Sequence, residues 1–460
     1  MFRWAILVAT IGLSLVPATT GAGGPGSWTR IQAGNAADAT PGLARTADGT
    51  LHVLWVRGGG ASADVVQQAI SPNGAFSGQP TTVATNWQVV NPDAELVRVG
   101  SGLRAVWAGV RAGVNGGQVV ASSSTDGSSW SAPTAITDAA SGVSASGIGA
   151  TAGPNGVLAA AQGDVAPGTN LVHVGGGKDT RYESGGCCAY DPEVAADAVT
   201  GKFFVGWFSS VPGRLGLWTQ EVSAAGLVGS AVHVPGSSSP DSLTAVRPGQ
   251  RAALTGRIGA GGVYLAYGAG YPTFGTVQLL RLGRRPVAVA RSSRIEHVGI
   301  APGPGGRLWL FWSTGDGYVV TRSNRSATRF ESVTRVALPN VGATTYGLYG
   351  EGSAGALDLV AHAGSGASIP DWHTQVLPRL SLTVLFSREE RKGGQLLRRL
   401  SLRVTDAGDP VQGAAVKVGG RTLRTAANGR VSGLFASTGK QAGARATKAG
   451  YATATTRVRL

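Results

Sequence analysis

Acidic, aromatic and imidazole side chains recur in this chain just ahead of short apolar runs. Those that could do chemistry are Asp93, Tyr190, Asp191, Asp241, His297 and Tyr346. Two carboxylates at a defined separation could hydrolyse a glycosidic bond. The same groups could instead bind a ligand such as Ca²⁺ or sugar hydroxyls. A third interpretation is that Asp beside Pro only caps a turn, as in Asn91-Pro92-Asp93. All three stay open, and in the ligand-binding interpretation these six residues form the site.

The stretch around Tyr190 adds the only two cysteines of the chain, Cys187 and Cys188, which are adjacent. In an exported protein we expect them to be oxidised, as a strained disulfide between neighbours that stiffens a loop. The alternative is a pair of thiols in a turn. No nucleotide-binding loop, zinc spacing or Gly-x-Ser-x-Gly elbow occurs, so we expect no cofactor and assign no residue to a metal site.

The apolar runs that follow these residues recur about every fifty residues, a period typical of repeat architectures. They end near Trp55, Trp107, Ala160, Trp207, Tyr267, Trp312 and Val360. In the first, the turn Asp48-Gly49 precedes Leu51, Val53 and Trp55, which alternate with other residues as in a strand. We predict an all-β fold in which residues 28–378 form a propeller of seven four-stranded blades. Six blades with an irregular insertion is the alternative.

Composition agrees with an exported all-β protein. The 460 residues include 72 Gly and are 42% hydrophobic but only 14% charged. Residues 1–22 resemble a secretory signal peptide, because Arg3 precedes the apolar run Trp4–Val16 and small residues surround Gly21. An uncleaved anchor is the alternative. We expect a secreted or envelope-associated protein, monomeric and without a membrane span in its mature part.

Residues 379–460 differ from the rest in charge. They contain sixteen Lys and Arg against four acids, a net charge of +12, and the whole chain has a net charge of +15. Strand-like runs separated by Asp409-Pro410, Gly419-Gly420 and Asn428-Gly429 predict a small β-sandwich. Such a domain could bind an anionic envelope polymer, or its charge could serve solubility alone. A nucleic-acid partner is not expected, because few aromatic residues are present to stack on bases.

The segment Ser124-Thr125-Asp126-Gly127-Ser128-Ser129-Trp130 resembles a shortened Asp-box, the BNR-repeat hairpin of sialidase-like propellers. In this motif Ser124 and Asp126 would satisfy the turn, Gly127 would take its strained φ, and Trp130 would pack into the blade. Residues 323–330 and 71–76 are degenerate copies. The resemblance implies a fold and not an activity, since the motif is structural.

Sialidases of this family use an Arg triad, a Tyr–Glu nucleophile pair and an Asp acid/base. Their first Arg opens an Arg-Ile-Pro-x-Leu run, where this chain has Ala39-Thr40-Pro41-Gly42-Leu43. Arg45 comes six residues later. We therefore expect no sialidase chemistry, because an anionic sugar needs a charged partner at that place.

The C-terminal segment is similar to the carboxypeptidase regulatory-like, prealbumin-like domains. The similarity lies in residues 404–414, 425–430 and 448–451, and it implies an accessory domain. The sequence thus predicts an exported propeller that binds a glycan or cell-surface polymer through its channel rim. A glycoside hydrolase that uses rim carboxylates is the alternative.

Overall fold

The computed structural model describes residues 25–31, 40–59, 62–88, 93–111, 117–137, 143–153, 156–163, 171–174, 180–181, 189–238, 252–340, 342–365 and 369–460. These residues form β-strands, turns and a short 3₁₀ helix, η2 (Pro304–Gly306). The fold is all-β, as the sequence predicts. Within the described ranges, no helix has the length and hydrophobicity needed to cross a bilayer.

Four-stranded antiparallel units follow one another along the chain, and each is built from consecutive strands. The first comprises β2 (Gly42–Arg45), β3 (Leu51–Gly59), β4 (Ser62–Ile70) and β5 (Phe76–Gln88). The second comprises β6 (Ala94–Val99), β7 (Gly102–Arg111), β8 (Gln118–Ser124) and β9 (Thr134–Ala135). These two units form one eight-stranded sheet, because β5 pairs with β7 at their edges.

The following units are separate sheets. One contains β10 (Val143–Gly153), β11 (Gly156–Gly163), β12 (Leu171–Val174) and β13 (Thr180–Arg181). The next contains β14 (Ala189–Ala196), β15 (Phe203–Ser209), β16 (Gly216–Ser223) and β17 (Gly226–His233). After it come β18 (Ala253–Arg257), β19 (Ala260–Ala269), β20 (Thr276–Arg281) and β21 (Val287–Arg291). Then follow β22 (Glu296–Gly303), β23 (Arg307–Thr314), β24 (Gly317–Arg322) and β25 (Thr334–Ala337).

One sheet joins the two ends of this part of the chain. It contains β26 (Thr344–Glu351), β27 (Leu357–Gly364) and β28 (Asp371–Val376), and its fourth strand is β1 (Thr29–Arg30). Thr29 pairs with His373 in antiparallel register. The N-terminal strand therefore completes the sheet formed by β26, β27 and β28, more than 300 residues later in the chain.

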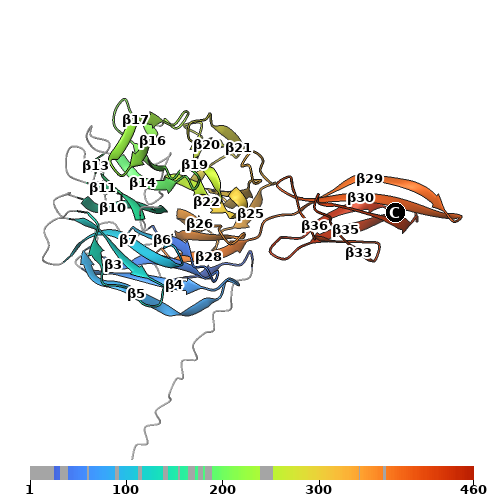
Figure 1. The fold of residues 1–460 in the computed structure, drawn as a ribbon, viewed down its shortest axis with the longest axis horizontal. Helices are drawn as coiled ribbons and strands as arrows, with labels where there is room; N and C mark the ends of the chain where they lie inside the picture. The colour runs from blue at the N-terminus through green and yellow to red at the C-terminus, as the bar shows by residue number, and fades with distance from the viewer. Residues whose placement is uncertain are drawn as a thin grey trace, which may run out of the picture.

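Hydrophobic packing passes from each sheet to the next and returns to the first. Trp107 and Leu54 belong to a core between the first two units, and Trp207 packs with Leu158 of the preceding sheet. The closing core joins Trp55 of β3 to Tyr349 and Val360 of the last sheet. The sheets thus form a closed ring, which Figure 1 shows from β3 through β16 and β20 to β28.

The ring explains why the strand that contains Leu51 and Trp55 is buried on both of its faces. Alternation predicts one buried and one open face for Leu51–Trp55, yet every residue from Leu51 to Val56 is buried, including His52. A strand inside a ring has a neighbouring sheet on each face, so both faces need apolar or satisfied polar side chains.

The C-terminal residues form two further sheets that share one core. The first contains β29 (Ser381–Lys392), β30 (Gln395–Asp406), β31 (Asp409–Pro410) and β34 (Arg430–Ala436). The second contains β32 (Ala415–Val418), β33 (Arg421–Arg424), β35 (Gln441–Thr447) and β36 (Ala454–Arg459). Figure 1 shows these strands projecting from one end of the molecule.

Buried charges attach the C-terminal sheets to the ring. Arg322, on β24, pairs with Asp406, which also accepts a hydrogen bond from the Tyr451 hydroxyl at 3.1 Å. Arg307, on β23, pairs with Asp409 at 2.7 Å. Arg307, Arg322 and Asp406 are each less than 10% exposed. Breaking one member of such a buried group leaves an uncompensated charge, so the attachment is specific.

Glu331 lies beside this junction. Its carboxylate accepts a hydrogen bond from the backbone N–H of Arg379 at 3.0 Å. Burial raises the pKa of Glu331 to about 7, against the opposing effects of Arg379 and Arg322. This carboxyl therefore titrates near neutrality at the point where the chain leaves the ring.

Candidate ligand-binding site in the central cavity

A cavity of about 590 Å³ lies at the centre of the ring. One strand from each four-stranded unit, β2, β6, β10, β14, β18, β22 and β26, contributes to its wall. Each of these strands provides at least one apolar residue: Leu43, Leu96, Ala150, Val194, Leu254, Ile300 and Leu348. The volume lies in the range of small-molecule sites, and polar and apolar groups contribute nearly equally to the wall.

Glycines let the strands of this wall approach one another. A Cβ atom at Gly42 would lie 2.4 Å from the backbone nitrogen of Leu96. At Gly149 it would lie 2.6 Å from the carbonyl oxygen of Pro192, and at Gly256 2.0 Å from that of Ala196. The width of the cavity thus depends on these three positions having no side chain.

Two carboxylates enter the cavity wall from matching positions. Asp93 directly precedes β6, and Glu95 is the second residue of that strand. In the same way Glu193 comes two residues after Asp191, and both lie in β14. Both glutamates line the cavity. One oxygen of Glu95 accepts the N–H of Leu96 at 3.1 Å, and one oxygen of Glu193 accepts the N–H of Val194 at 2.8 Å. These contacts hold two oxygen-rich groups at the wall of one hollow.

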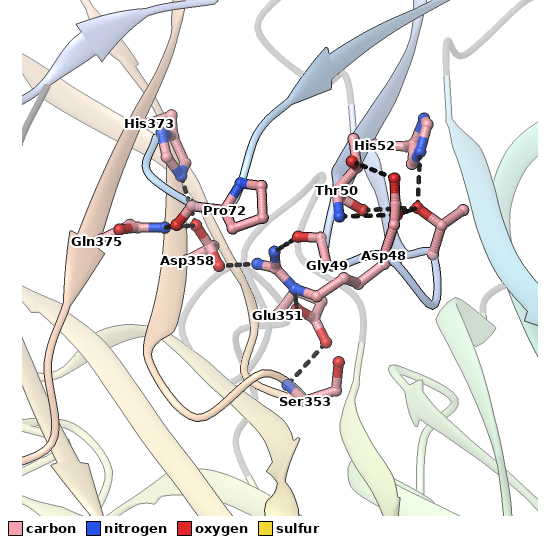
Figure 2. A network of polar contacts seen from close by, with 12 residues as sticks. Asp48, Gly49, Thr50, His52, Pro72, Glu351, Ser353, Asp358, His373 and Gln375 are labelled. Atoms are coloured by element: carbon pink, nitrogen blue, oxygen red, sulfur yellow. Dashed lines mark hydrogen bonds and ion pairs between the residues drawn. The ribbon is translucent and has the colours of Figure 1, made fainter. Parts of the chain in front are cut away.

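Arg45 also lines the cavity, but its charge is already paired. Its Nε donates to Glu351 at 2.8 Å and its guanidinium pairs with Asp358. Asp358 accepts further bonds from His373 at 2.8 Å and Gln375 at 3.0 Å. Figure 2 shows this network, with the Glu351 carboxylate also reaching the N–H of Ser353. Because Arg45 is 5% exposed and faces two carboxylates, it is not available to an anionic substrate.

The hairpin turn that precedes β3 is fixed in the same region (Figure 2). Hydrogen bonds from Thr46 and Thr50 lower the pKa of Asp48 to about 2. His52 contacts the Thr46 hydroxyl at 3.2 Å, and burial lowers its pKa. These groups stabilise the turn and do not reach the cavity wall.

The structure brings two of the residues singled out in the sequence close together. His297 contacts the carbonyl oxygen of Thr345 at 3.0 Å, next to Tyr346 in the chain. The ring of Tyr346 meets His362 edge-on at 6.3 Å, and His362 bonds Asp371 at 2.8 Å. His297 is buried while Tyr346 is partly exposed. This group lies at the start of β22 and β26.

Two of the site residues predicted from the sequence, His297 and Asp191, share an unusual backbone conformation. His297 has a φ of 46° and Asp191 a φ of 49°. In both strands the pairing register shifts at this point, between Glu296 and Gly299 and between Tyr190 and Glu193. Bulges of this kind re-aim side chains and are frequent beside functional sites.

The other predicted site residues that the structure describes are Asp93 and Tyr190. Asp93 is 2% exposed and accepts the N–H of Thr40 at 3.0 Å, which matches the turn-capping interpretation. The backbone of Tyr190 pairs with Phe208 in β14. Asp241, Cys187 and Cys188 lie outside the described residues. Ligand binding by these residues, and the disulfide, stay predictions.

The residues of the Asp-box resemblance lie in the turn after β8. The Ser124 hydroxyl accepts the N–H of Gly127 at 2.8 Å, and Asp126 accepts that of Ser128 at 2.8 Å. Gly127 has a φ of 81°. The indole of Trp130 donates to the Gly127 carbonyl at 3.2 Å and packs against the core. Residues 71–76 and 323–330 occupy the corresponding turns after β4 and β24.

Sequence reasoning did not anticipate that Arg45 would pair with Glu351 and Asp358. It also did not single out Arg104, on β7, which lines a second hollow of the surface. The available signal was its place after the first leucine of a middle strand, where three other units have His52, Trp309 and Asp358. No cluster of three or more His, Cys, Asp or Glu suited to a metal ion occurs among the residues that the structure describes.

Comparison with known proteins gives no family. No protein-family model matches this chain, and no curated protein matches it. Among solved structures, a puromycin hydrolase mutant is similar at 14% identity with a TM-score of 0.44, covering 83% of this chain and 61% of that one.

Two fungal structures are also similar. The α-L-arabinanase of Penicillium chrysogenum is 13% identical with a TM-score of 0.37, covering 68% of this chain and 99% of that one. The Aleuria aurantia lectin, described as a six-bladed β-propeller, is 11% identical with a TM-score of 0.36, covering 61% and 90%. At these scores the likenesses assign neither a ligand nor an activity to this chain.

Proposed function

We propose that this chain is an exported seven-bladed propeller that binds a glycan at its central cavity, followed by a basic accessory β-sandwich. The observation that carries the proposal is the cavity of about 590 Å³, to which one strand of each four-stranded unit contributes. Its wall combines apolar residues with the carboxylates of Glu95 and Glu193. Carboxylate oxygens accept hydrogen bonds from sugar hydroxyls, which is the polar chemistry that a glycan offers.

The blade count in this proposal comes from the closed packing. Each four-stranded unit packs on the next, and the last packs on the first through Trp55, Tyr349 and Val360. Counting the two halves of the eight-stranded sheet separately gives one blade for each four-stranded unit that lines the cavity. Residues 28–378 would then be the propeller and residues 379–460 the sandwich, with residues 1–22 as the export signal.

The paired state of Arg45 favours a ligand other than sialic acid. A sialidase needs free arginines for the substrate carboxylate, and this Arg is held by Glu351 and Asp358. The other arginine of the described cavity wall, Arg98, lies exposed where β6 ends. Three carboxylates, those of Glu95, Glu193 and Glu351, line the cavity against these two arginines, so its side chains carry no excess of positive charge. We therefore infer a neutral glycan, which hydrogen bonds to its hydroxyls can hold without a cationic partner.

An array of neutral and acidic cell-wall oligosaccharides, probed with the full chain, tests the proposal. We expect binding to neutral glycans that Glu193→Gln weakens by about tenfold, because an ionised acceptor is replaced by a neutral amide. Glu221→Gln is the matched control, since Glu221 lies on β16 of the same sheet and pairs with Lys202 at the surface. Absence of binding to every glycan, or equal binding by both variants, would contradict the proposal.

A glycoside hydrolase is the second candidate, and the shared cavity of Glu95 and Glu193 favours it. Glycosidases use two carboxyl groups, one as acid and the other as base or nucleophile. The same variants decide between the two functions when released reducing sugar is measured. Turnover by the wild type that Glu95→Gln and Glu193→Gln each abolish would establish an enzyme, and binding without turnover would leave a binding protein.

A further inference from the structure

A second hollow, of about 540 Å³, lies on the surface of the sheet that contains β7 and β8. Its walls are the turn between β6 and β7, the start of β7, the end of β8 and the turn that follows β8. Six of its eleven lining residues are Ser or Thr, among them Ser101, Ser123 and Ser129, and its larger side chains include Arg104 and Trp130. We call this hollow the Trp130 groove.

The Trp130 groove and the central cavity share one wall. Where β6 ends and turns into β7, Arg98 and Gly100 line the central cavity. Val99 and Ser101, which alternate with them, line the Trp130 groove. A chain molecule leaving the cavity at this side would therefore need to cross only one turn to reach the groove.

Arg104 differs from the residues that occupy the same place in three other four-stranded units. It follows the buried Leu103 at the start of a middle strand, as His52 follows Leu51, Trp309 follows Leu308 and Asp358 follows Leu357. In those sheets the side chain is buried and has a partner. His52 bonds Gln67 at 3.0 Å, Trp309 lies under the Arg322 guanidinium at 5.2 Å, and Asp358 pairs with Arg45.

The Arg104 side chain has no such partner in the part of the chain that the structure describes. It is half-buried, its Nε is enclosed without a hydrogen bond, and no carboxylate pairs with it. A guanidinium in this state offers donors that match a planar carboxylate. The groove therefore contains a cation whose natural counterpart is an anion from outside the chain.

Trp130 supplies the second element of a sugar site. Its Nε1 is fixed by the Gly127 carbonyl at 3.2 Å, and part of the ring packs against the core. The rest of the side chain lines the groove and remains partly exposed. A rigid indole with an open surface gives a sugar ring a large contact area at a small cost in conformational entropy.

We propose that the Trp130 groove is a second binding site, for an acidic sugar of the uronate class. The sugar ring packs on Trp130, its carboxylate pairs with Arg104, and the serine hydroxyls bond the ring hydroxyls. The inference rests on the proposed function only in taking the ligand to be a glycan. It adds the chemical class of the sugar that would occupy the groove when another part of the same glycan lies in the central cavity.

The test compares the full chain with trigalacturonate and with galactotriose, its neutral counterpart, by calorimetry. We expect trigalacturonate to bind, with an affinity that falls as salt concentration rises. Arg104→Gln should lower the affinity for trigalacturonate by about tenfold or more, which is the loss expected when a charge-assisted hydrogen bond is removed. Arg104→Lys should retain part of the affinity, and Trp130→Phe should retain more than Trp130→Ala.

Arg284→Gln is the control, because it removes one exposed positive charge from the turn between β20 and β21. Thermal melting of every variant shows whether it is folded. No binding of trigalacturonate by the wild type would overturn the proposal. Unchanged binding by folded Arg104→Gln would also overturn it, because the anion would then bind outside the Trp130 groove. Neutral-glycan binding that depends on Glu193 would survive either result, so the two proposals fail separately.

Discussion

At the scale of single residues, the ion pairs of Arg45 limit what the cavity can bind. The sequence places an arginine near the position where a sialidase would need one. The structure shows that Glu351 and Asp358, which are 306 and 313 residues away in the chain, neutralise it. A residue type at a promising position is therefore no evidence of a site until its partners are known.

Removing this arginine should destabilise the ring. Arg45→Met leaves the buried carboxylates of Glu351 and Asp358 without their cation, which typically costs about 3–5 kcal/mol. Urea unfolding measures the change in the free energy of unfolding. Arg57→Met is the control, because Arg57 is 56% exposed and pairs with Asp64 at the surface. We expect that pair to contribute less than about 1 kcal/mol, and equal effects of both variants would show that the buried network is not stabilising.

At the scale of strands, the wall of the cavity depends on close contacts between neighbouring sheets. The glycines at 42, 149 and 256 allow these contacts, and their φ angles are ordinary. Their role is therefore the absence of a side chain and not a special backbone conformation.

Gly256→Ala tests this role. A Cβ atom there would lie 2.0 Å from the carbonyl oxygen of Ala196, so one strand must move. We expect a loss of at least about 1–3 kcal/mol, as for other overpacked interiors, and weaker glycan binding. Gly443→Ala, on β35, is the matched control, since nothing lies within 4 Å of its Cβ position. A neutral Gly256→Ala in denaturant titration would contradict the close packing.

The strands were more predictable than the site. Trp55, Trp107, Trp207 and Trp312 end apolar runs in the sequence, and they lie in β3, β7, β15 and β23. Local alternation and turn residues are enough for that prediction. The orientation of Asp191 and His297 was not predictable, because a bulge interrupts the period of two in their strands. The partners of Arg45 and the open state of Arg104 depend on contacts between distant segments, which no local pattern encodes.

At the scale of the whole molecule, the C-terminal sheets are joined to the ring by charges and not by an apolar face alone. Asp406 and Asp409 meet Arg307 and Arg322 there. Glu331, beside this junction, has a pKa of about 7 because it is buried. The junction should therefore respond to pH in the neutral range.

The sign of this response follows from the two pKa values of Glu331. The folded protein holds the proton up to about pH 7, whereas the unfolded chain releases it near 4.5. Stability from this group is thus present at low pH and falls as pH rises between these values. Glu331→Gln keeps the acceptor for the Arg379 N–H and should remove that component. We expect the variant to gain stability over the wild type as pH rises from 5 to about 7.5, and a constant difference in melting temperature would contradict the assignment.

The pairing of β1 with β28 bears on how the protein is made. Thr29 and Arg30 leave the ribosome long before His373 and Trp372, with which they pair. Until β28 is available, the sheet of β26 and β27 lacks both β28 and β1, and the ring cannot close. If the chain is exported, the early strand must stay unpaired through translocation, and closure is left to the far side of the membrane. Long-range pairing of this kind is slow and leaves sheet edges open to other chains. We therefore expect the yield of folded protein to depend on chaperones that cover those edges until β28 is available.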